Sequence, residues 1–331
     1  MIISRTPYRV SFFGGGTDYP SWYRIEGGAV LSSAIDKYCY ISCRYLPPFF
    51  DMRHRIVWSH IETVGTIQEI LHPAIKGGVQ FLGFDESNGL EIHHQGDLPA
   101  RSGIGSSSTF SVGLIKALLA LRGQEIGKFD LASKAIELEQ NILKESVGSQ
   151  DQIAAAYGGL NVIRFLQNNT FEVNALNISK KRISDLEKNL LLLYTGESRM
   201  GGAVAAKVIA GLKQNAVHLK KLAAMVDEAA QILSSENSLE DFGGLLHESW
   251  MLKRELADGI SNRMVDEIYQ NALKHGAVGG KLLGAGSKGF MLFYVPVEKQ
   301  AAVKNALPNY LWVPFQLDSE GSSIIYHGSN Y

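Results

Sequence analysis

The sequence predicts an α+β protein of two domains, and three observations support this prediction. Its 331 residues exceed the roughly 100–200 of one typical domain. Short β-branched and apolar runs dominate the first half, whereas helical patterns fill the chain from about residue 201 to 275 before strands return. The composition changes near Ser179–Lys188, so we expect an N-terminal domain over 1–178 and a C-terminal domain over 179–331.

Each element is expected from its own pattern. In the first part, strands are predicted at Arg9–Phe13, Ala29–Arg44, Gly89–His94, Asn161–Phe165, Thr170–Val173 and Leu190–Tyr194. Helices are predicted at Ser107–Leu121, Phe129–Lys144, Gly201–Leu212, Val217–Leu233, Leu239–Ala257 and Val265–Lys274. The tail is expected to form strands at Phe290–Val295, Tyr310–Pro314 and Ile324–Tyr326, with a helix around Val297–Leu307.

The composition excludes several classes of function. A formal net charge of −1 gives no electrostatic footprint for nucleic acid or for a membrane surface. No apolar run approaches the roughly 20 residues of a membrane span, and Met1–Arg9 has no apolar core of signal-peptide length. Cys39 and Cys43 share one face of an expected strand and are interpreted as buried thiols. We therefore expect a cytoplasmic protein, and the oligomeric state stays open, a homodimer included.

The stretch Pro99–Thr109 is the strongest functional signal. Gly103 and Gly105 permit positive φ and close approach of the backbone to a ligand. The stretch then opens a helix, whose free N–H groups and positive dipole end favour an anion. Three serines and Thr109 add hydroxyl groups, one of which can also ligate Mg²⁺. A capped helix after a flexible turn is the structural alternative, but the combination favours a phosphate-binding loop that differs from a Walker motif.

Two further glycine clusters lie near the ends of the chain. Gly14–Gly16 end an expected strand and are followed by Asp18, whose carboxylate suits sugar hydroxyls; a tight turn with Asp18 as its cap explains the pattern equally well. Gly284–Gly289 matches Gly-x-Gly-x-x-Gly, yet a strand follows where a dinucleotide site requires a helix. We interpret it as a glycine turn, either beside the active site or in a plain hairpin.

Two acids in the middle of the chain are candidates for chemistry. Glu139 falls at the edge of the apolar stripe of its helix, so it is a candidate Mg²⁺ ligand, with an intrahelical pair to Lys134 or Lys144 as the alternative. Glu137 is expected to face water. Asp151 stands near the start of an Ala-rich helix, where it could accept the proton of an attacking hydroxyl or complement the helix dipole. The residues alone favour the dipole role for Asp151.

Together these clusters resemble the motifs of the GHMP kinases, named for galactokinase, homoserine kinase, mevalonate kinase and phosphomevalonate kinase. The middle motif of that family has the form Pro-x-x-x-Gly-Leu-Gly-Ser-Ser, and Pro99–Ser107 matches it with Ile in place of Leu. The order of the three motifs also matches, so the resemblance spans nearly the whole chain. It implies an N-terminal domain like the second domain of ribosomal protein S5 and a ferredoxin-like C-terminal domain.

Within the family, the resemblance is strongest to the D-glycero-D-manno-heptose 7-phosphate kinases. They carry Gly-Gly-Gly-Thr-Asp in the first motif, as at Gly14–Asp18, and Gln-Asp-Gln before an Ala-rich helix, as at Gln150–Gly159. They also share Ser-Trp-x-x-Lys, as at Ser249–Lys253, and Gly-Ala-Gly-x-x-Gly-Phe, as at Gly284–Phe290. The last motif has Ser and Lys at its two x positions, where small residues are common.

The resemblance implies a role for each matching residue. Asp151 would orient or deprotonate the sugar hydroxyl, and Arg9 would pair with that acid and with the transferring phosphate. Glu139 and Ser107 would bind Mg²⁺. The triphosphate of ATP would be held by Ser102, Gly103, Ile104, Gly105, Ser106, Ser107 and Ser108. The hydroxyls of the acceptor would be bound by Asp18, in the loop with Gly15, Gly16 and Thr17.

The predicted activity is transfer of the γ-phosphate of ATP to the anomeric hydroxyl of D-glycero-D-manno-heptose 7-phosphate, giving the 1,7-bisphosphate for nucleotide-activated heptose synthesis. An acceptor that already carries phosphate needs a second anion site, for which Arg199 and Lys253 are candidates, with solvated surface charge as their alternative. A fucokinase-like or galactokinase-like activity is the runner-up. A catalytically silent sugar or nucleotide sensor is disfavoured because Asp151, Glu139 and Ser107 are all present.

Overall fold

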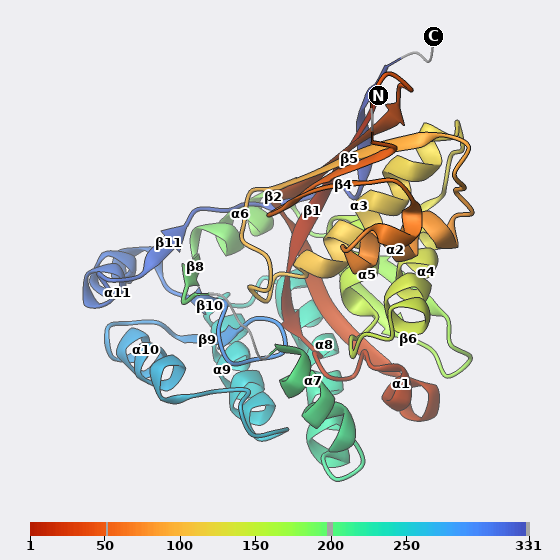
Figure 1. Ribbon diagram of the computed structural model, residues 1–331. Coiled ribbons are helices and arrows are strands. Elements are labelled where there is room, and N and C mark those ends of the chain that lie inside the picture. Colours follow the sequence, from red (N-terminus) through yellow and green to blue (C-terminus); the bar gives the residue numbers. More distant parts are fainter. Residues whose placement is uncertain (51, 197–200, 329–331) are drawn as a thin grey trace.

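The computed structural model describes residues 1–50, 52–196 and 201–328, and Figure 1 shows two sheets flanked by helices. The larger sheet has the order β13-β1-β2-β5-β3-β4; β6 and β12 also pair with β2, and β7 pairs with β6. Its strands are β1 (Ile2–Phe13), β2 (Gly28–Leu46), β3 (His54–Val57), β4 (Ile61–Val64), β5 (Gly89–Gly96), β6 (Leu160–Phe165), β7 (Phe171–Ala175), β12 (Leu317–Asp318) and β13 (Ser323–His327). The strands predicted up to residue 173 are confirmed, and most are longer than expected.

The long strand β2 joins the parts of this sheet. It pairs antiparallel with β1 along most of its length, with β5 near its end and with β6 near its start. Ile35, Cys39, Ile41 and Cys43 are spaced by even numbers of residues, so they share one face of β2, and all are buried in the core. Both thiols are free and buried, as predicted.

Helices α3 (Ser106–Leu121), α4 (Lys128–Glu137) and α5 (Gln150–Tyr157) form one layer against the larger sheet. The mostly apolar α3 packs against β1 and β2 on one side and against α4 and α5 on the other. The helix predicted to continue to residue 144 changes character at Leu138–Ile142, which form a π-helical turn. Glu137 is exposed and Glu139 is fully buried, so the predicted difference between these two acids is confirmed.

Several short elements lie outside the predicted set. They are α1 (Pro20–Glu26), η1 (Ile67–Glu69), α2 (Pro73–Phe81), α6 (Lys180–Lys188), strands β3, β4 and β12, and strand β9 (Gly279–Leu282) of the smaller sheet. α1 and α2 each begin with a proline, whose fixed φ suits the first turn of a helix. Elements of this length offer too few residues for a periodic pattern to be read with confidence from sequence.

The smaller sheet has the antiparallel order β11-β8-β10-β9 and is packed against helices of the second half. Helix α9 packs against β9 and β10, while α8 contacts β1 and β2 of the larger sheet. The elements here are β8 (Leu190–Tyr194), α7 (Gly201–Ala210), α8 (Ala216–Ser234), α9 (Glu240–Arg254), α10 (Arg263–Lys274), β9 (Gly279–Leu282), β10 (Phe290–Tyr294), η3 (Val297–Lys299), α11 (Gln300–Ala306) and β11 (Leu311–Val313). The predicted elements of this half lie within a few residues of their expected ends.

The two halves meet where β1 ends. Phe242 of α9 is fully buried and makes edge contacts with Phe12 and Phe13, with ring centroids 5.4 and 5.1 Å apart. This packing brings α9 and the turn after β9 against the end of β1. Within the described part of the chain, no helix has the length and apolar character needed to cross a bilayer.

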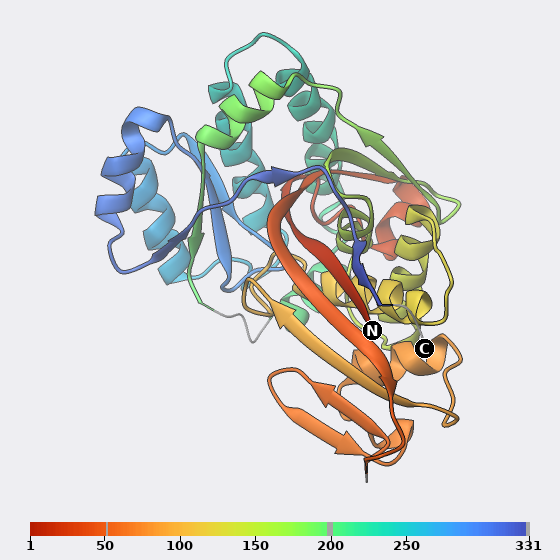
Figure 2. The ribbon, with the colours of Figure 1, turned by 90° about the horizontal axis from the view of Figure 1, so that it is seen from above.

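The end of the chain returns to the larger sheet. β13 pairs antiparallel with β1, and the N–H of Gly328 donates to the carbonyl oxygen of Met1 at 2.8 Å, so the last described residue lies beside the N-terminus (Figure 2). β12 pairs with β2. The division into 1–178 and 179–331 stays a prediction, and we propose it with the two tail strands assigned to the larger sheet.

Candidate active site

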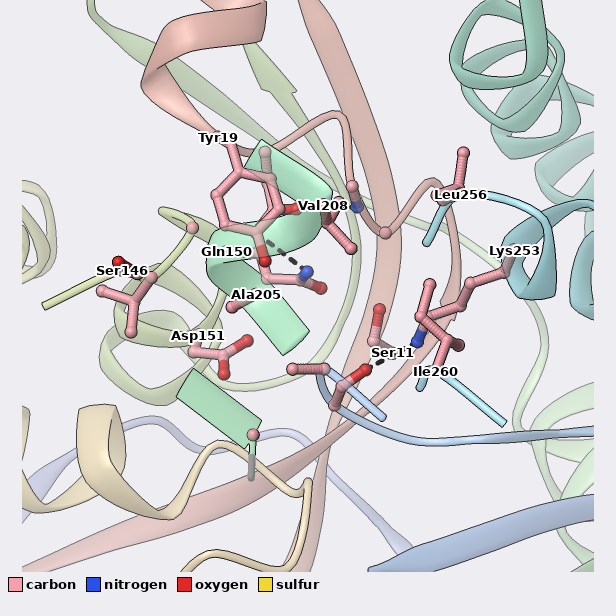
Figure 3. A pocket seen from close by; sticks show the side chains of 18 of the residues that line it. Ser11, Tyr19, Ser146, Gln150, Asp151, Ala205, Val208, Lys253, Leu256 and Ile260 are labelled. Carbon is pink, nitrogen blue, oxygen red and sulfur yellow. Dashed lines mark hydrogen bonds between the residues drawn. The ribbon is translucent and has the colours of Figure 1, made fainter. Parts of the chain in front are cut away.

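A cavity of about 180 Å³ lies where the glycine clusters meet (Figure 3). Its walls come from β1, the loop after β1, the segment leading into α5, the start of α7, the end of α9 and the turn after β9. Among the lining residues that the structure describes, the charged ones are Arg9, Asp18, Asp151, Lys253 and Lys281. These segments are far apart in the sequence, so the fold alone brings the charges together.

Arg9 and Asp151 form a bidentate ion pair at the wall of this cavity. Nε and Nη2 of Arg9 donate to the two carboxylate oxygens of Asp151 at 2.8 and 2.6 Å, and Nη1 donates to the carbonyl oxygen of Gly103 at 2.7 Å. The side chain of Arg9 is 4% exposed and that of Asp151 is 23% exposed. A planar guanidinium that holds both oxygens fixes the orientation of the carboxylate. The residues that the resemblance pairs are therefore in contact, and their catalytic role stays a prediction.

Gly105 lies against this ion pair at the start of α3. Its φ is +74°, and a β-carbon there would lie 3.3 Å from both Cγ of Arg9 and Oδ2 of Asp151. Gly103 has a φ of +84°, and a β-carbon on it would lie 2.5 Å from the carbonyl oxygen of Leu283. Glycine is thus required at both positions by conformation and by space. The turn between β9 and β10 is therefore a hairpin that also packs on the predicted phosphate-binding loop.

The residues of that loop divide into buried and accessible ones. Ser102 and Ile104 are fully buried, and the hydroxyl of Ser102 donates to the carbonyl oxygen of Pro99 at 2.6 Å. Ser106 is half-buried and Ser107 is exposed. Because the N-cap residue Gly105 has no side chain, no side-chain cap competes for the first N–H groups of α3. These backbone N–H groups are better placed to donate to phosphate than the buried hydroxyl of Ser102, and the buried side chain of Ile104 has no donor.

Glu139 is a fully buried carboxylate behind the start of α3. Its oxygens accept hydrogen bonds from Ser108 at 2.7 Å and from Ser111 at 2.8 Å, and Gln152 also donates to it. Burial raises the pKa of Glu139 to about 7, with a smaller contribution from Glu145, although the hydroxyl hydrogen bonds lower it. Among the described residues, no cation pairs with this carboxylate.

The predicted Mg²⁺ ligands Ser107 and Glu139 are near each other but not bonded to each other. Ser107 hydrogen-bonds Glu145, whereas Ser108 hydrogen-bonds Glu139. The group offers two carboxylates and a hydroxyl, all of them the oxygen donors that Mg²⁺ prefers. A cation between the two acids would also relieve the repulsion that raises the pKa of Glu139. The residues therefore fit Mg²⁺, with Glu145 as an additional candidate ligand.

Asp18 is held in the cavity wall by two donors. The N–H of Gly16 donates to its Oδ1 at 3.0 Å and Nε2 of Gln150 donates to its Oδ2 at 2.9 Å. Burial raises the pKa of Asp18, and the charge of Asp151 raises it further. A β-carbon on Gly148 would lie 1.8 Å from Oδ2 of Asp18, so this glycine is needed for the close approach of the two segments. Asp18 is thus fixed in the cavity that Asp151 lines.

The three residues before Asp18 in the chain differ in whether they line the cavity. Gly15 and Gly16 line the cavity. Thr17, predicted in the same loop, is fully buried and is not among the lining residues. Its hydroxyl donates to the carbonyl oxygens of Gly14 at 2.8 Å and Ala29 at 2.9 Å, so it holds the loop in shape.

Lys253, predicted to bind the phosphate of the acceptor, lines the cavity from the last turn of α9. Its Nζ donates to the carbonyl oxygen of Gly284 at 2.6 Å. Burial, followed by repulsion from Arg9, lowers the pKa of Lys253 to about 8. Arg199, the other predicted phosphate-binding residue, lies outside the described residues.

Several polar residues at the site lie outside the predicted set, among them Ser11, Glu145, Gln150 and Lys281. Ser11 lies two residues after Arg9 on β1, so the period of a strand was the signal that places both on one face. Gln150 precedes Asp151 in the quoted Gln-Asp-Gln motif. Glu145 follows the π-helical turn in an irregular segment, and Lys281 lies on an unpredicted strand, so neither had a local signal.

Two family models match separate parts of the chain. The model described as GHMP kinases N terminal domain matches residues 67–159, and the model described as GHMP kinases C terminal matches residues 223–311. Together they span more than half of the chain. The first match contains the phosphate-binding loop, Glu139 and Asp151, and the second contains Lys253 and the turn after β9.

Individual proteins similar to this chain are named as sugar kinases, and their names specify different acceptor sugars. A D-glycero-alpha-D-manno-heptose 7-phosphate kinase of Campylobacter jejuni is 29% identical over 332 residues, covering 92% of each chain. A bifunctional fucokinase/GDP-fucose pyrophosphorylase of Arabidopsis thaliana is 28% identical, covering 86% of this chain and 29% of its own. The crystal structure of a D-glycero-D-manno-heptose 1-phosphate kinase from Bacteroides thetaiotaomicron matches with a TM-score of 0.81 at 25% identity, over 99% of this chain and 100% of that one.

Proposed function

Because this chain belongs to the GHMP kinases and is an ATP-dependent phosphotransferase, we propose that it phosphorylates the anomeric hydroxyl of D-glycero-D-manno-heptose 7-phosphate. The product would be the 1,7-bisphosphate, which serves nucleotide-activated heptose synthesis. The observation that carries the proposal is the Arg9–Asp151 pair at the cavity wall, in contact with the phosphate-binding loop through Gly103 and Gly105. In this proposal, the carboxylate of Asp151 lies beside the expected position of the γ-phosphate, where it can interact with the acceptor hydroxyl.

Under this proposal, Asp151 orients the acceptor hydroxyl and takes its proton. The hydroxyl oxygen forms a bond to the γ-phosphorus, the bond from that phosphorus to the bridging oxygen of ADP breaks, and the hydroxyl proton passes to Asp151. Arg9 holds both carboxylate oxygens, so Asp151 is oriented before any substrate binds. Since phosphoryl transfer needs little covalent help from the protein, such positioning supplies much of the rate.

Ser107, Glu139 and Glu145 are the proposed residues for Mg²⁺, which supplies charge neutralisation to the phosphates when bound. Ser108 and Ser111 fix the direction of the Glu139 carboxylate. The first N–H groups of α3 would offset the remaining charge on the phosphates. The donors for the triphosphate thus come mostly from the backbone, which does not have to rearrange as the reaction proceeds.

The chemistry of the cavity supports a sugar phosphate as acceptor. The carboxylate of Asp18 is fixed by Gly16 and Gln150, which suits it to accept hydrogen bonds from sugar hydroxyls. Lys253 and Lys281 supply positive charge that an unphosphorylated sugar does not need. The relatives named for heptose phosphates, one for the 7-phosphate and one for the 1-phosphate, agree with an acceptor of this class.

L-Fucose is the second candidate acceptor. The observation that favours it is the 28% identity to a protein named fucokinase over 86% of this chain. Fucose carries no phosphate, so under this alternative the two lysines would have no acceptor anion to bind.

An acceptor panel tests the proposal. Heptose 7-phosphate, free heptose, L-fucose and D-galactose are compared in one ATP-coupled assay, and the phosphorylated position is read by ³¹P NMR. We expect turnover of heptose 7-phosphate with a new anomeric phosphate. Strong turnover of a free hexose with none of heptose 7-phosphate would sink the heptose assignment.

The role of Asp151 is tested with Asp151→Asn. Loss of an acid that takes a proton in the transition state typically costs about 10²–10⁴ in kcat, and we expect a loss in that range with ATP binding retained. Asp130→Asn is the matched control, because Asp130 is also a first-turn helix acid but is exposed on α4. Unchanged turnover in Asp151→Asn would refute the assignment of the base.

A further inference from the structure

Ser11 lines the cavity with a hydroxyl that has no partner of its own. The residue is 6% exposed, and within the described part of the chain nothing hydrogen-bonds its Oγ. It lies on β1, on the same face as Arg9. A buried hydroxyl without a partner costs free energy, and such groups in proteins call for an explanation. A ligand that accepts from Ser11 or donates to it would complete this group.

Two lysines border the same part of the cavity as Ser11. Lys281 of β9 is 2% exposed and donates to the carbonyl oxygen of Phe12, the residue next to Ser11, at 2.7 Å. Lys253 donates to the carbonyl oxygen of Gly284, and Figure 3 shows its side chain extending toward Ser11, across the cavity from Asp151. An ammonium group has three N–H donors. Lys253 also donates to the carbonyl oxygen of Leu282 at 3.4 Å, so the bonds found among the described residues leave one donor on Lys253 and two on Lys281 for a ligand.

The cavity is bordered by two lysines, the half-buried Lys253 and the buried Lys281, and no acid forms an ion pair with either among the described residues. Asp151 already forms an ion pair with Arg9. The other acid of the cavity, Asp18, attracts both lysines, but its carboxylate oxygens already accept hydrogen bonds from Gly16 and Gln150. Burial and then repulsion from Lys253 and Arg9 lower the pKa of Lys281, so the cations of the cavity disfavour one another. A bound anion would remove this repulsion and would take up the free donors.

We propose that Ser11, Lys253 and Lys281 form a subsite for the phosphate group that the acceptor sugar carries before the reaction. This inference rests on the proposed function, and nothing in the sequence had assigned Ser11 or Lys281 to the site. At about 3.3 Å per residue of strand, Ser11 lies roughly 7 Å from Arg9 along β1. The subsite is therefore displaced from the Arg9–Asp151 pair, which leaves room for the sugar ring between the anomeric oxygen and the bound phosphate.

The rival use of the same residues is contact with the γ-phosphate of ATP. Gly284, which Lys253 holds, packs against Gly103 of the phosphate-binding loop, so this use has a structural basis. Ser11 lies farther along β1 than Arg9, and Lys281 of β9 donates to Phe12, which follows Ser11; these positions favour the phosphate of the acceptor. The two uses can be distinguished by substitution of these residues. Loss of an acceptor-phosphate subsite raises KM for the acceptor, whereas loss of a γ-phosphate contact raises KM for ATP.

The test compares Ser11→Ala and Lys281→Met with wild type. Because the Ser11 hydroxyl has no partner among the described residues, we expect Ser11→Ala to keep the fold. Lys281→Met also removes the hydrogen bond to Phe12, so Ser11→Ala is the decisive variant. Ser32→Ala is the matched control, because Ser32 is also a fully buried serine with an unpartnered hydroxyl but does not line the cavity. Loss of one hydrogen bond to a charged group corresponds to about a tenfold change. We expect KM for heptose 7-phosphate to rise about tenfold in Ser11→Ala, with kcat, KM for ATP and KM for free heptose unchanged.

Inorganic phosphate provides a measurement that does not depend on turnover. We expect it to raise the Tm of wild type and of Ser32→Ala, and to raise that of Ser11→Ala less. An increase in KM for ATP, or an equal increase for free and phosphorylated heptose, would overturn the subsite. If wild type turns over only free hexoses while phosphate still binds through Ser11, the acceptor proposal fails and the subsite stands as an anion site. If phosphate binding is the same in Ser11→Ala, the subsite fails whatever the acceptor.

Discussion

Gly103 and Gly284 are in direct backbone contact: a β-carbon on Gly284 would lie 2.5 Å from the Cα of Gly103. The first belongs to the loop before α3 and the second to the turn after β9, so this contact joins the two halves of the molecule at the active site. Gly284 also has a φ of +71°, which disfavours any side chain.

Gly284→Ala should therefore push the two loops apart. We expect KM for ATP to rise and kcat to fall, each by about tenfold or more, because small displacements of catalytic groups are costly. The measurement is steady-state kinetics at varied ATP. Gly244→Ala is the control, since no atom lies within 4 Å of a β-carbon built on Gly244 in α9. Normal ATP kinetics in Gly284→Ala would contradict the importance of this contact.

Arg9→Lys should separate charge from geometry. A lysine keeps the positive charge but cannot hold both oxygens of Asp151, so we expect kcat to fall by about 100-fold through loss of orientation. Arg5→Lys is a matched control on the same strand, because Arg5 makes a partly exposed ion pair with Glu320. A kcat in Arg9→Lys within twofold of wild type would show that charge alone is sufficient.

The Mg²⁺ site should depend on pH through Glu139. Burial raises the pKa of this acid to about 7 from an ordinary value of 4.5. The folded protein therefore binds the proton more tightly than the unfolded chain, and the metal-free protein loses stability as pH rises from about 4.5 to 7. Mg²⁺ competes with that proton, so we expect it to raise the Tm more at pH 8 than at pH 6.

Glu139→Gln should remove this pH dependence, while Glu137→Gln should retain it, because Glu137 is the exposed acid on the same helix. Thermal melts with and without Mg²⁺ at both pH values provide the comparison. Equal shifts of Tm at pH 6 and pH 8 in wild type would argue against Glu139 as a ligand.

Acceptor binding should weaken at alkaline pH through Lys253. Burial and Arg9 lower the pKa of this lysine to about 8, so it is charged below that pH and neutral above it. We expect KM for heptose 7-phosphate to rise as pH increases through 8, with a smaller change in KM for free heptose.

Lys253→Arg keeps its charge to far higher pH, so its KM should stay constant across the same range. A wild-type KM for heptose 7-phosphate that is flat up to pH 9.5 would contradict a charged Lys253 in acceptor binding.

The packing of α9 on β1 should be a major source of stability. Phe242 is fully buried against Phe12 and Phe13, so Phe242→Ala leaves a cavity at the junction of the two halves. We expect a loss of about 3–5 kcal/mol in the free energy of unfolding, measured by urea denaturation. Phe49→Ala should change it by less than about 0.5 kcal/mol, because Phe49 is 90% exposed. Similar losses in both variants would show that the junction is not tightly packed.

The periodic elements could be predicted because their patterns are local. The long apolar run of α3 and the alternation in the second half of β2 are present in the sequence itself, and both elements form where expected. The glycines and serines before α3 form a continuous motif, so this loop can be recognised in the sequence, and phosphate binding there stays a prediction. The Arg9–Asp151 pair was different: the residues alone favoured a dipole role for Asp151, and only the resemblance to a family joined it to Arg9.

The candidate Mg²⁺ ligands show that a local sequence pattern does not tell which side chains contact one another. Consecutive residues on a helix differ by about 100° in direction, so three serines in a row point three ways. Which one meets Glu139 depends on how α3 packs, and it is Ser108, while Ser107 meets Glu145. The π-helical turn adds a further displacement that the regular period does not predict.

Most of the strands and helices can be predicted from the sequence, which also contains the three glycine clusters and the acids and bases available for chemistry. Tertiary packing brings some of these groups into one cavity: Ser11 and Lys281 join Lys253 because β1, β9 and α9 meet at the Phe242 contact. The physical reason is the sequence separation over which each kind of interaction acts. Backbone conformation and amphipathic period are fixed by neighbours in the chain, whereas hydrogen bonds and charge interactions at the site join residues more than a hundred positions apart.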